Sequence, residues 1–213
     1  MQWFSLTATF LQFSGLGGFI ANLRKKVKKN FNELALRNGE LVKALQRIED
    51  LAMRDELTGV FNRRFLMEAI RNEKLRCDRT GIVFTLCIVD VDHFKQVNDQ
   101  HGHLAGDQVL QQIARTASDA LRQTDIFGRY GGEEFAMVLT GTTSEGAIIT
   151  AERVRRHIEE IDFTSISPGF KVTVSIGIAD SLGGEDPALT FKRADEALYA
   201  AKEGGRNRCL VAP

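Results

Sequence analysis

The sequence predicts an α/β domain in which a mixed central sheet of about five strands is flanked by helices and preceded by a coiled-coil helix. Helical and strand patterns alternate from about Asp55 to Pro213. The run IVFTLCIV, Ile82 to Val89, is continuously apolar, which is typical of a strand buried on both faces. Hydrophobic residues make up 43% of the chain and charged residues 26%. This composition suits a globular domain of about 150 residues with a smaller part attached.

The order of the expected elements follows from caps and periodicity. A helix begins after Asn62, whose side chain is a good N-cap, and continues through NRRFLMEAIRNEKL. Further helices are expected over Leu104–Leu121, Glu145–Ile161 and Pro187–Lys202, and further strands over Glu134–Leu139, Lys171–Ala179 and near Cys209.

Charge and cysteine content exclude two classes of protein. Lysine plus arginine number 28 and so do aspartate plus glutamate, so no global field attracts nucleic acid, and we expect no nucleic-acid partner. The three cysteines show no CxxC spacing. We expect them to be reduced thiols, with Cys77 and Cys87 in or beside apolar stretches, and not a disulfide framework.

The first segment, residues 1–22, predicts a membrane-spanning helix. Trp3 to Ala21 carries no charge and is about long enough to cross a bilayer, and RKKVKK follows at Arg24 to Lys29. The rest of the chain would then lie in the cytoplasm, at the cytoplasmic (inner) membrane, with this helix as the last of a longer sensor. The alternative is an apolar helix packed on the domain or on a partner, in a cytoplasmic protein. A signal peptide fits less well, because the charges follow the apolar run.

The second segment, residues 23–54, holds a heptad register. Apolar residues alternate by four and three positions, with Asn38 at an a position where paired amides favour one dimer register. The seam consists of Val27, Phe31, Leu34, Asn38, Leu41, Leu45, Ile48 and Ala52. It favours a parallel two-stranded coil over a single amphipathic helix lying on its own domain, although Gly39 weakens the helix locally.

Two acidic motifs in the third segment, residues 55–213, carry candidate chemistry. Asp90 and Asp92 follow the buried strand and share a face, with the Val91 carbonyl between them, a set of oxygen ligands that suits Mg²⁺ bound with phosphates. The alternative is a solvated loop. The string RYGGEEF, Arg129 to Phe135, predicts a hairpin with a diglycine turn. Its two adjacent glutamates would repel each other unless a cation or substrate lay between them.

With these motifs the third segment resembles a known family. GGEEF is one of the two common forms of the motif that names the GGDEF-domain diguanylate cyclases. Four further blocks resemble that family in order: DELTGVFNRR at Asp55–Arg64, DVDHFKQVNDQHGHLAGD at Asp90–Asp107, TVSIGIA at Thr173–Ala179, and ADEALYAAKEGGRN at Ala194–Asn207. The resemblance implies a fold like that of adenylyl cyclases and polymerase palm domains.

The resemblance also implies a set of site residues. Asp90, the Val91 carbonyl and Glu133 would hold two Mg²⁺ ions, which Mn²⁺ could replace, and Glu134 would lie near the ribose 3′-hydroxyl. Asn98 and Asp107 would recognise guanine. Leu57 would pack against the base. The phosphates would be bound by the Phe94 and Lys95 amides and by the side chains of Lys202 and Arg206. His103 would orient its loop.

The activity implied is the condensation of two GTP molecules into cyclic di-GMP with release of pyrophosphate. Each domain would bind one GTP, so two domains would face each other, and the coiled coil would raise the effective concentration of the second. Arg122-Gln-Thr-Asp125 matches the family's RxxD product-inhibition site, with Arg153 as a helper. The alternative for Arg122 and Asp125 is a local salt bridge. His101, His103 and His157 show no metal-ligand spacing.

Two other functions remain open on the sequence alone. One is a catalytically inactive receptor for cyclic di-GMP or GTP, which would usually lack the acids that are all present here. The other is a synthase of a different cyclic dinucleotide, against which Asp107 argues because that position favours guanine.

Overall fold

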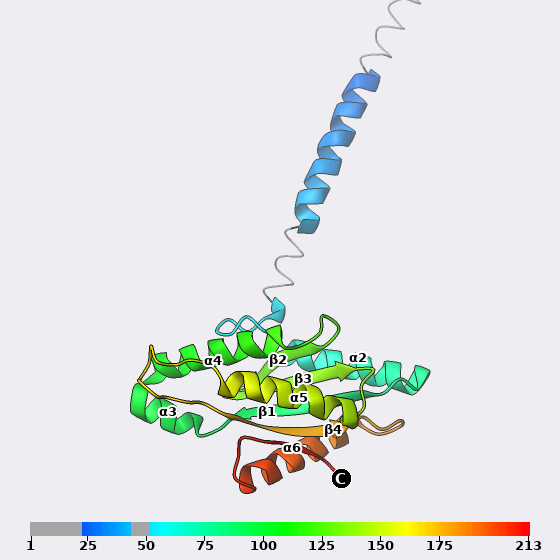
Figure 1. The fold of residues 1–213 in the computed structure, drawn as a ribbon. Coiled ribbons are helices and arrows are strands. Elements are labelled where there is room, and N and C mark those ends of the chain that lie inside the picture. The colour runs from blue at the N-terminus through cyan, green and yellow to red at the C-terminus, as the bar shows by residue number, and fades with distance from the viewer. Residues whose placement is uncertain (1–22, 44–51) are drawn as a thin grey trace, which may run out of the picture. The chain divides into compact units, whose positions relative to one another are not determined.

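The computed structural model describes residues 23–43 and 52–213 (Figure 1). The chain forms two compact units, one of residues 1–52 and one of Met53–Pro213. The predicted membrane segment Trp3–Ala21 and the seam residues Leu45 and Ile48 lie outside the described residues. Within the described ranges, no helix is long and apolar enough to cross a membrane.

The described part of the first unit is a helix over residues 23–43. Its seam residues Val27, Phe31, Leu34 and Leu41 are 58–70% exposed. The apolar stripe that the heptad predicts is therefore present on the helix and is uncovered within the described chain.

The second unit is built on one five-stranded sheet with the order β2-β3-β1-β4-β5. The first four strands pair antiparallel, and β4 pairs parallel with β5. The bounds are β1 (Phe84–Val91), β2 (Ile126–Gly131), β3 (Glu134–Thr140), β4 (Val174–Asp180) and β5 (Cys209–Val211). Every residue of β1 is buried, because β1 lies in the middle of the sheet and helices cover both of its faces.

Helices cover the sheet in two layers, as Figure 1 shows. The helices are α2 (Arg63–Thr80), α3 (Phe94–His101), α4 (His103–Asp119), α5 (Ser144–Glu159) and α6 (Pro187–Glu203). One apolar cluster joins α4 and α5 to the sheet face that carries Val89 and Met137. A second joins α2 and α6 to the opposite face, with Leu86 and Val138. Alternate side chains of the same strands thus point into two separate cores.

Helix α6 lies unusually close to the sheet, which fixes the position of its C-terminal end. A Cβ added at Gly177 of β4 would lie 2.0 Å from the carbonyl oxygen of Ala194 and 2.3 Å from the backbone nitrogen of Leu198. Only glycine allows this approach. The last turn of α6, with Lys202, is held beside the end of β1 for this reason.

The predicted fold class is confirmed, with a mixed five-stranded sheet flanked by helices. Asn62 caps α2 as predicted, its side chain accepting the Phe65 N–H at 3.0 Å, and the three cysteines are free and buried. One helix was missed: α3 lies between Asp92 and the helix predicted from Leu104, in a stretch where the sequence predicts no helix. The strand predicted from Lys171 begins at Val174.

Candidate active site

The two acidic motifs meet at one edge of the sheet. In the antiparallel pairing of β1 with β3, Asp90 stands opposite Glu134. The N–H of Val91 donates to the carbonyl oxygen of Glu133 at 3.4 Å. The predicted hairpin therefore delivers both glutamates to the end of β1.

The hairpin turn consists of Gly132 and Glu133, between Gly131 at the end of β2 and Glu134 at the start of β3. Gly132 has φ +51, in the left-handed region, whereas Gly131 does not have a positive φ. Of the two glycines in the diglycine turn, only Gly132 uses the freedom of glycine to adopt a positive φ.

Arg129 supports this turn, and its role was missed. Its Nε donates to the Gly132 carbonyl at 2.9 Å, and its Nη1 lies 3.1 Å from Oδ1 of Asp55. Asp55 also accepts the N–H and the hydroxyl of Thr58. Both partners belong to strings noted in the sequence, but nothing in the sequence signals that residues 74 positions apart pair.

Lys202 compensates the charge of Asp90. Its Nζ lies 2.9 Å from Oδ2 of Asp90, whose residue is only 8% exposed. Burial raises the pKa of Asp90, the Lys202 ammonium opposes that rise, and the negative charges of Glu133 and Asp92 add to it. The structure thus brings together four of the predicted catalytic residues, namely Asp90, Glu133, Glu134 and Lys202.

Glu134 also sits where its charge is unfavourable. Burial raises the pKa of Glu134, and the neighbouring Asp90 carboxylate raises it further, while Lys202 opposes the shift. A pKa raised in the folded state means that folding costs more once the carboxyl is ionised.

We therefore expect Glu134→Gln to stabilise the protein modestly at neutral pH without divalent cations, because it removes a partly buried like charge. The gain should be complete at pH values above the folded-state pKa. It should vanish below about pH 4, where glutamate is protonated in both folded and unfolded chains. Thermal unfolding of both proteins from pH 3 to pH 8 in a chelator would measure this. A gain that persists unchanged at pH 3 would contradict the electrostatic explanation.

Asp92 does not share the role expected from its spacing. Its carboxylate accepts hydrogen bonds from the hydroxyls of Thr173 and Ser175, both at 2.7 Å, and from the N–H of Asn207 at 3.0 Å. These three donors occupy the carboxylate. In the described chain these bonds of Asp92 are structural, and the ligand set implied for the metal, Asp90, Val91 and Glu133, does not include it.

The remaining donor atoms fit a divalent cation that is bound together with phosphates. In the parts of the chain that the structure describes, no group of three or more His, Cys, Asp or Glu side chains converges as a metal site. Two carboxylates and one backbone carbonyl, from Asp90, Glu133 and Val91, make an incomplete oxygen shell. Mg²⁺ commonly uses one or two carboxylates and completes its shell with water and substrate phosphates.

The start of α3 offers anion-binding groups beside these acids. Its N-cap, His93, has φ +58 and forms no side-chain cap, and the first turn holds no acidic residue. The N–H groups of Phe94 and Lys95 face no acceptor among the described residues. Unpaired amides at a helix N-terminus form a favourable site for phosphate.

The residues expected to recognise guanine lie on α3 and α4, which pack together. Asn98 lies against Gly106, since a Cβ added there would be 2.0 Å from Oδ1 of Asn98. Asp107 is the next residue and is half-buried. Leu57 packs against the main core, and its carbonyl accepts Nε2 of Gln111 at 3.1 Å. His103 is exposed at the first position of α4.

Gly106→Ala should displace the Asn98 amide, because the new methyl group would overlap a flexible side chain and leave the backbone in place. We expect the affinity for GTP to fall about ten-fold, as for loss of one or two hydrogen bonds, with little change in stability. Competition between GTP and ATP would measure the loss of base selection. Unchanged selection with an intact fold would show that Asn98 does not contact the base.

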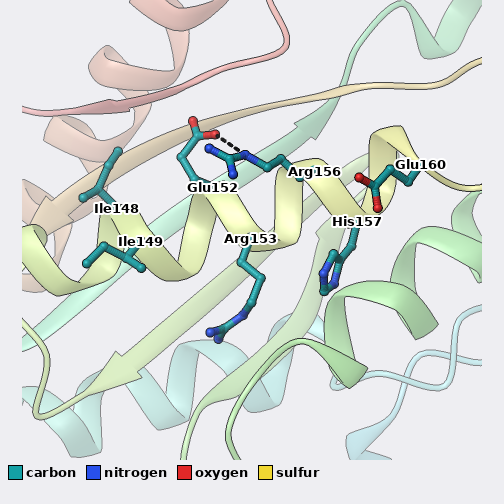
Figure 2. A pocket seen from close by; sticks show the side chains of 7 residues that line it. All are labelled: Ile148, Ile149, Glu152, Arg153, Arg156, His157 and Glu160. Carbon is teal, nitrogen blue, oxygen red and sulfur yellow. Dashed lines mark ion pairs between the residues drawn. The ribbon is translucent and has the colours of Figure 1, made fainter.

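The candidate product site occupies a different surface. Asp125 accepts the backbone N–H of Arg122 at 3.0 Å, and the structure records no ion pair between their side chains in the described chain. Arg153 of α5 donates to the carbonyl of Ala120 at 2.8 Å, which holds it against the turn that carries Arg122. Arg153 also lines a hollow of about 520 Å³ with Arg156 and His157 (Figure 2). Arg122 and Asp125 line a separate hollow of about 510 Å³ with Arg54 and Arg115.

An α/β fold with paired carboxylates beside open amides at a helix N-terminus is typical of domains that bind a nucleotide together with a metal ion. The comparison with known families gives the same result. The family model described as "Diguanylate cyclase, GGDEF domain" matches residues 52–208. The chain belongs to this family.

Individual relatives and solved structures that are similar to this chain also carry diguanylate cyclase or GGDEF names. Diguanylate cyclase DgcP of Pseudomonas aeruginosa is 43% identical over 161 residues, which are 76% of this chain and 24% of that protein. The coiled coil and GGDEF domain of DgcB from Caulobacter crescentus, solved with c-di-GMP, superposes with a TM-score of 0.79 at 29% identity, covering 87% of this chain and 99% of that one. Diguanylate cyclase SiaD of P. aeruginosa, solved with its activator SiaC, gives 0.79 at 36% identity over 98% of this chain and 80% of that one. The chain spans from about a quarter to about half the length of the curated relatives it matches.

Proposed function

We propose that this protein is a diguanylate cyclase that joins two GTP molecules into cyclic di-GMP and releases pyrophosphate. The observation that carries the proposal is the cluster at the end of β1, where Asp90, Glu133 and Glu134 meet Lys202 beside the open N-terminus of α3. Acids, a cation and free amides in one place are the groups that phosphoryl transfer requires.

Each residue has a role in positioning or charge compensation. Asp90, the Val91 carbonyl and Glu133 would hold two Mg²⁺ ions, or Mn²⁺, which would supply charge neutralisation at the α-phosphate. The Phe94 and Lys95 amides, Lys202 and Arg206 would hold the phosphates, while Asn98, Asp107 and Leu57 hold guanine and His103 orients the loop between α3 and α4. Glu134 has a raised pKa, which suits it to accept the proton of the attacking 3′-hydroxyl.

The reaction requires a homodimer, because one domain holds one GTP and the ring contains two. The exposed seam on helix 23–43 supports pairing of two chains there, with the catalytic domains facing each other. We further propose that residues 1–22 attach the protein to the cytoplasmic membrane with the catalytic domain in the cytoplasm. If they do not span the bilayer, the protein is cytoplasmic.

A cyclic di-GMP or GTP receptor without turnover is the second candidate, and the complete acid cluster argues against it. The experiment that separates the two is release of pyrophosphate from GTP, with and without Mg²⁺. A cyclase releases pyrophosphate only with the cation, and ATP does not replace GTP. Tight GTP binding with no release in either condition would favour the receptor.

Product inhibition through Arg122, Asp125 and Arg153 is a further part of the proposal. Arg122→Ala should raise the product concentration needed for half inhibition by about ten-fold or more, since a charged bidentate contact is lost. The initial rate should stay nearly unchanged, because Arg122 lies away from the acid cluster. Rates measured with added cyclic di-GMP would test this. Identical inhibition curves would remove Arg122 from the product site.

A further inference from the structure

The loop between α6 and β5 carries Arg206 in an unusual backbone conformation. Three successive residues have positive φ: Gly205 at +111, Arg206 at +63 and Asn207 at +48. For residues other than glycine this region is sterically unfavourable, and such residues persist when surrounding contacts hold them. The contacts that hold this loop therefore decide where Arg206 points.

Asn207 makes those contacts on both sides. Its side-chain Nδ2 donates to Oε1 of Glu159 at 2.9 Å, and its Oδ1 accepts Nη1 of Arg155 at 2.7 Å. Its backbone N–H donates to Oδ2 of Asp92 at 3.0 Å. Both polar ends of the amide are used, so the side chain is fixed in one orientation.

Each anchor is itself held. Asp92 is 5% exposed and accepts the hydroxyls of Thr173 and Ser175. On α5, Arg155 forms ion pairs with Glu152 at 3.0 Å and with Glu159 at 2.9 Å. Asn207 thus joins two rigid elements, the end of β1 and the last turns of α5, through one loop residue.

Arg206 itself is free to contact a ligand. Among the described residues its guanidinium has no recorded hydrogen bond or ion pair, and the residue is only half-buried. Its backbone is bound, because the N–H donates to the Ala201 carbonyl at 3.0 Å and the carbonyl accepts Nε of Arg208 at 3.1 Å. The loop presents a cation on a fixed backbone at the edge that holds Asp90.

We propose that Asn207 is a positioning residue whose side chain ties the Arg206 loop to α5 and so holds the Arg206 guanidinium at the place where substrate phosphates bind. This inference rests on the proposed function, since that function places GTP at this edge. Asn207 does not touch the substrate in this account, and acts through Arg206.

Asn207→Gly removes the side-chain bonds and keeps the left-handed backbone at little cost. A second pair of variants exchanges the donor and the acceptor of the hydrogen bond between Asn207 and Glu159. Asn207→Asp alone sets two carboxylates face to face, at positions 207 and 159. Adding Glu159→Gln restores one donor and one acceptor across the contact. The double variant Asn207→Asp with Glu159→Gln should recover most of what Asn207→Asp loses.

The probe is 3′-deoxy-GTP, supplied with Mg²⁺. This nucleotide lacks the attacking hydroxyl and so binds without reacting. The comparison ligand is 2′-deoxyguanosine, which has no phosphate. Asn207→Gly should weaken binding of 3′-deoxy-GTP about ten-fold, as expected for a charge-assisted contact that loses its geometry. Binding of the nucleoside should be unchanged. In a double-mutant cycle, the variant that combines Asn207→Gly with Arg206→Ala should bind 3′-deoxy-GTP no more weakly than Arg206→Ala alone, because Asn207 acts through Arg206.

Additive losses in that cycle, or equal weakening of nucleotide and nucleoside, would overturn the inference, and so would failure of the donor and acceptor exchange to recover binding. The measurement does not depend on turnover. If the wild-type protein binds 3′-deoxy-GTP and shows these differences but makes no product, the proposed function fails and the positioning role stands. If the wild-type protein binds no guanine nucleotide, both fail.

Discussion

Glu133→Gln is expected to lower GTP turnover by at least about a hundred-fold, because it replaces one of the two carboxylates proposed to hold the metal ions next to the transferring phosphate. Glu133 is the second residue of the hairpin turn, and its carbonyl, not its side chain, accepts the Val91 N–H. The turn should therefore keep its backbone bonds in the variant. Initial rates with GTP and Mg²⁺ measure the effect, with circular dichroism to verify the fold.

Glu196→Gln is the matched control. It makes the same change on the outer face of α6, where the Glu196 side chain is 62% exposed and, among the residues that the structure describes, pairs with Lys192 alone, at 3.8 Å. Its rate should equal that of the wild type. Wild-type turnover in a folded Glu133→Gln protein would remove Glu133 from the metal site.

Disrupting the seam should make activity depend on enzyme concentration. Leu41→Glu with Leu45→Glu would bury unpaired carboxylates in a paired coil and so separate the two chains. We expect specific activity at nanomolar enzyme to fall at least about ten-fold and to recover as the enzyme concentration rises, because the coil supplies the effective concentration of the second domain. A protein beginning at Asp55 should behave in the same way.

Leu36→Glu is the control for this pair. Leu36 is 65% exposed on the same helix but lies off the seam, at an f position of the register. It should leave the dimer and the rate unchanged.

Asn38→Leu tests register instead of affinity: it should tighten the coil while allowing other registers, so activity could fall in a more stable dimer. A seam-charged protein that is monomeric in ultracentrifugation yet fully active at nanomolar concentration would contradict the role of the coil.

The region around β1 shows best which features of the site can be predicted from the sequence. Its continuous apolar run predicts a central strand, and the adjacent DVD and GGEEF strings predict acids at its end. Both predictions depend on local pattern alone, and the structure brings Asp90 to Glu134 through strand pairing.

The contacts that support this site are not local, and the sequence does not reveal them. Asp92 has the same spacing and chemistry as a metal ligand, and only the nearness of Thr173, Ser175 and Asn207 shows that its carboxylate is occupied. The pair of Arg129 with Asp55 and the anchoring of Asn207 on α5 likewise join segments far apart in the chain. Helix α3 was missed because its eight residues are too few to show a helical period.

If the acid cluster at the end of β1 joins two GTP molecules, the product of the reaction identifies the activity. The wild-type protein should be incubated with GTP and Mg²⁺, and the nucleotide product identified by mass spectrometry while pyrophosphate is counted. We expect cyclic di-GMP with two pyrophosphates released for each ring, and neither cyclic di-GMP nor pyrophosphate from Asp90→Asn. A linear or single-nucleotide product, or GTP left intact by a folded wild-type dimer, would contradict this expectation.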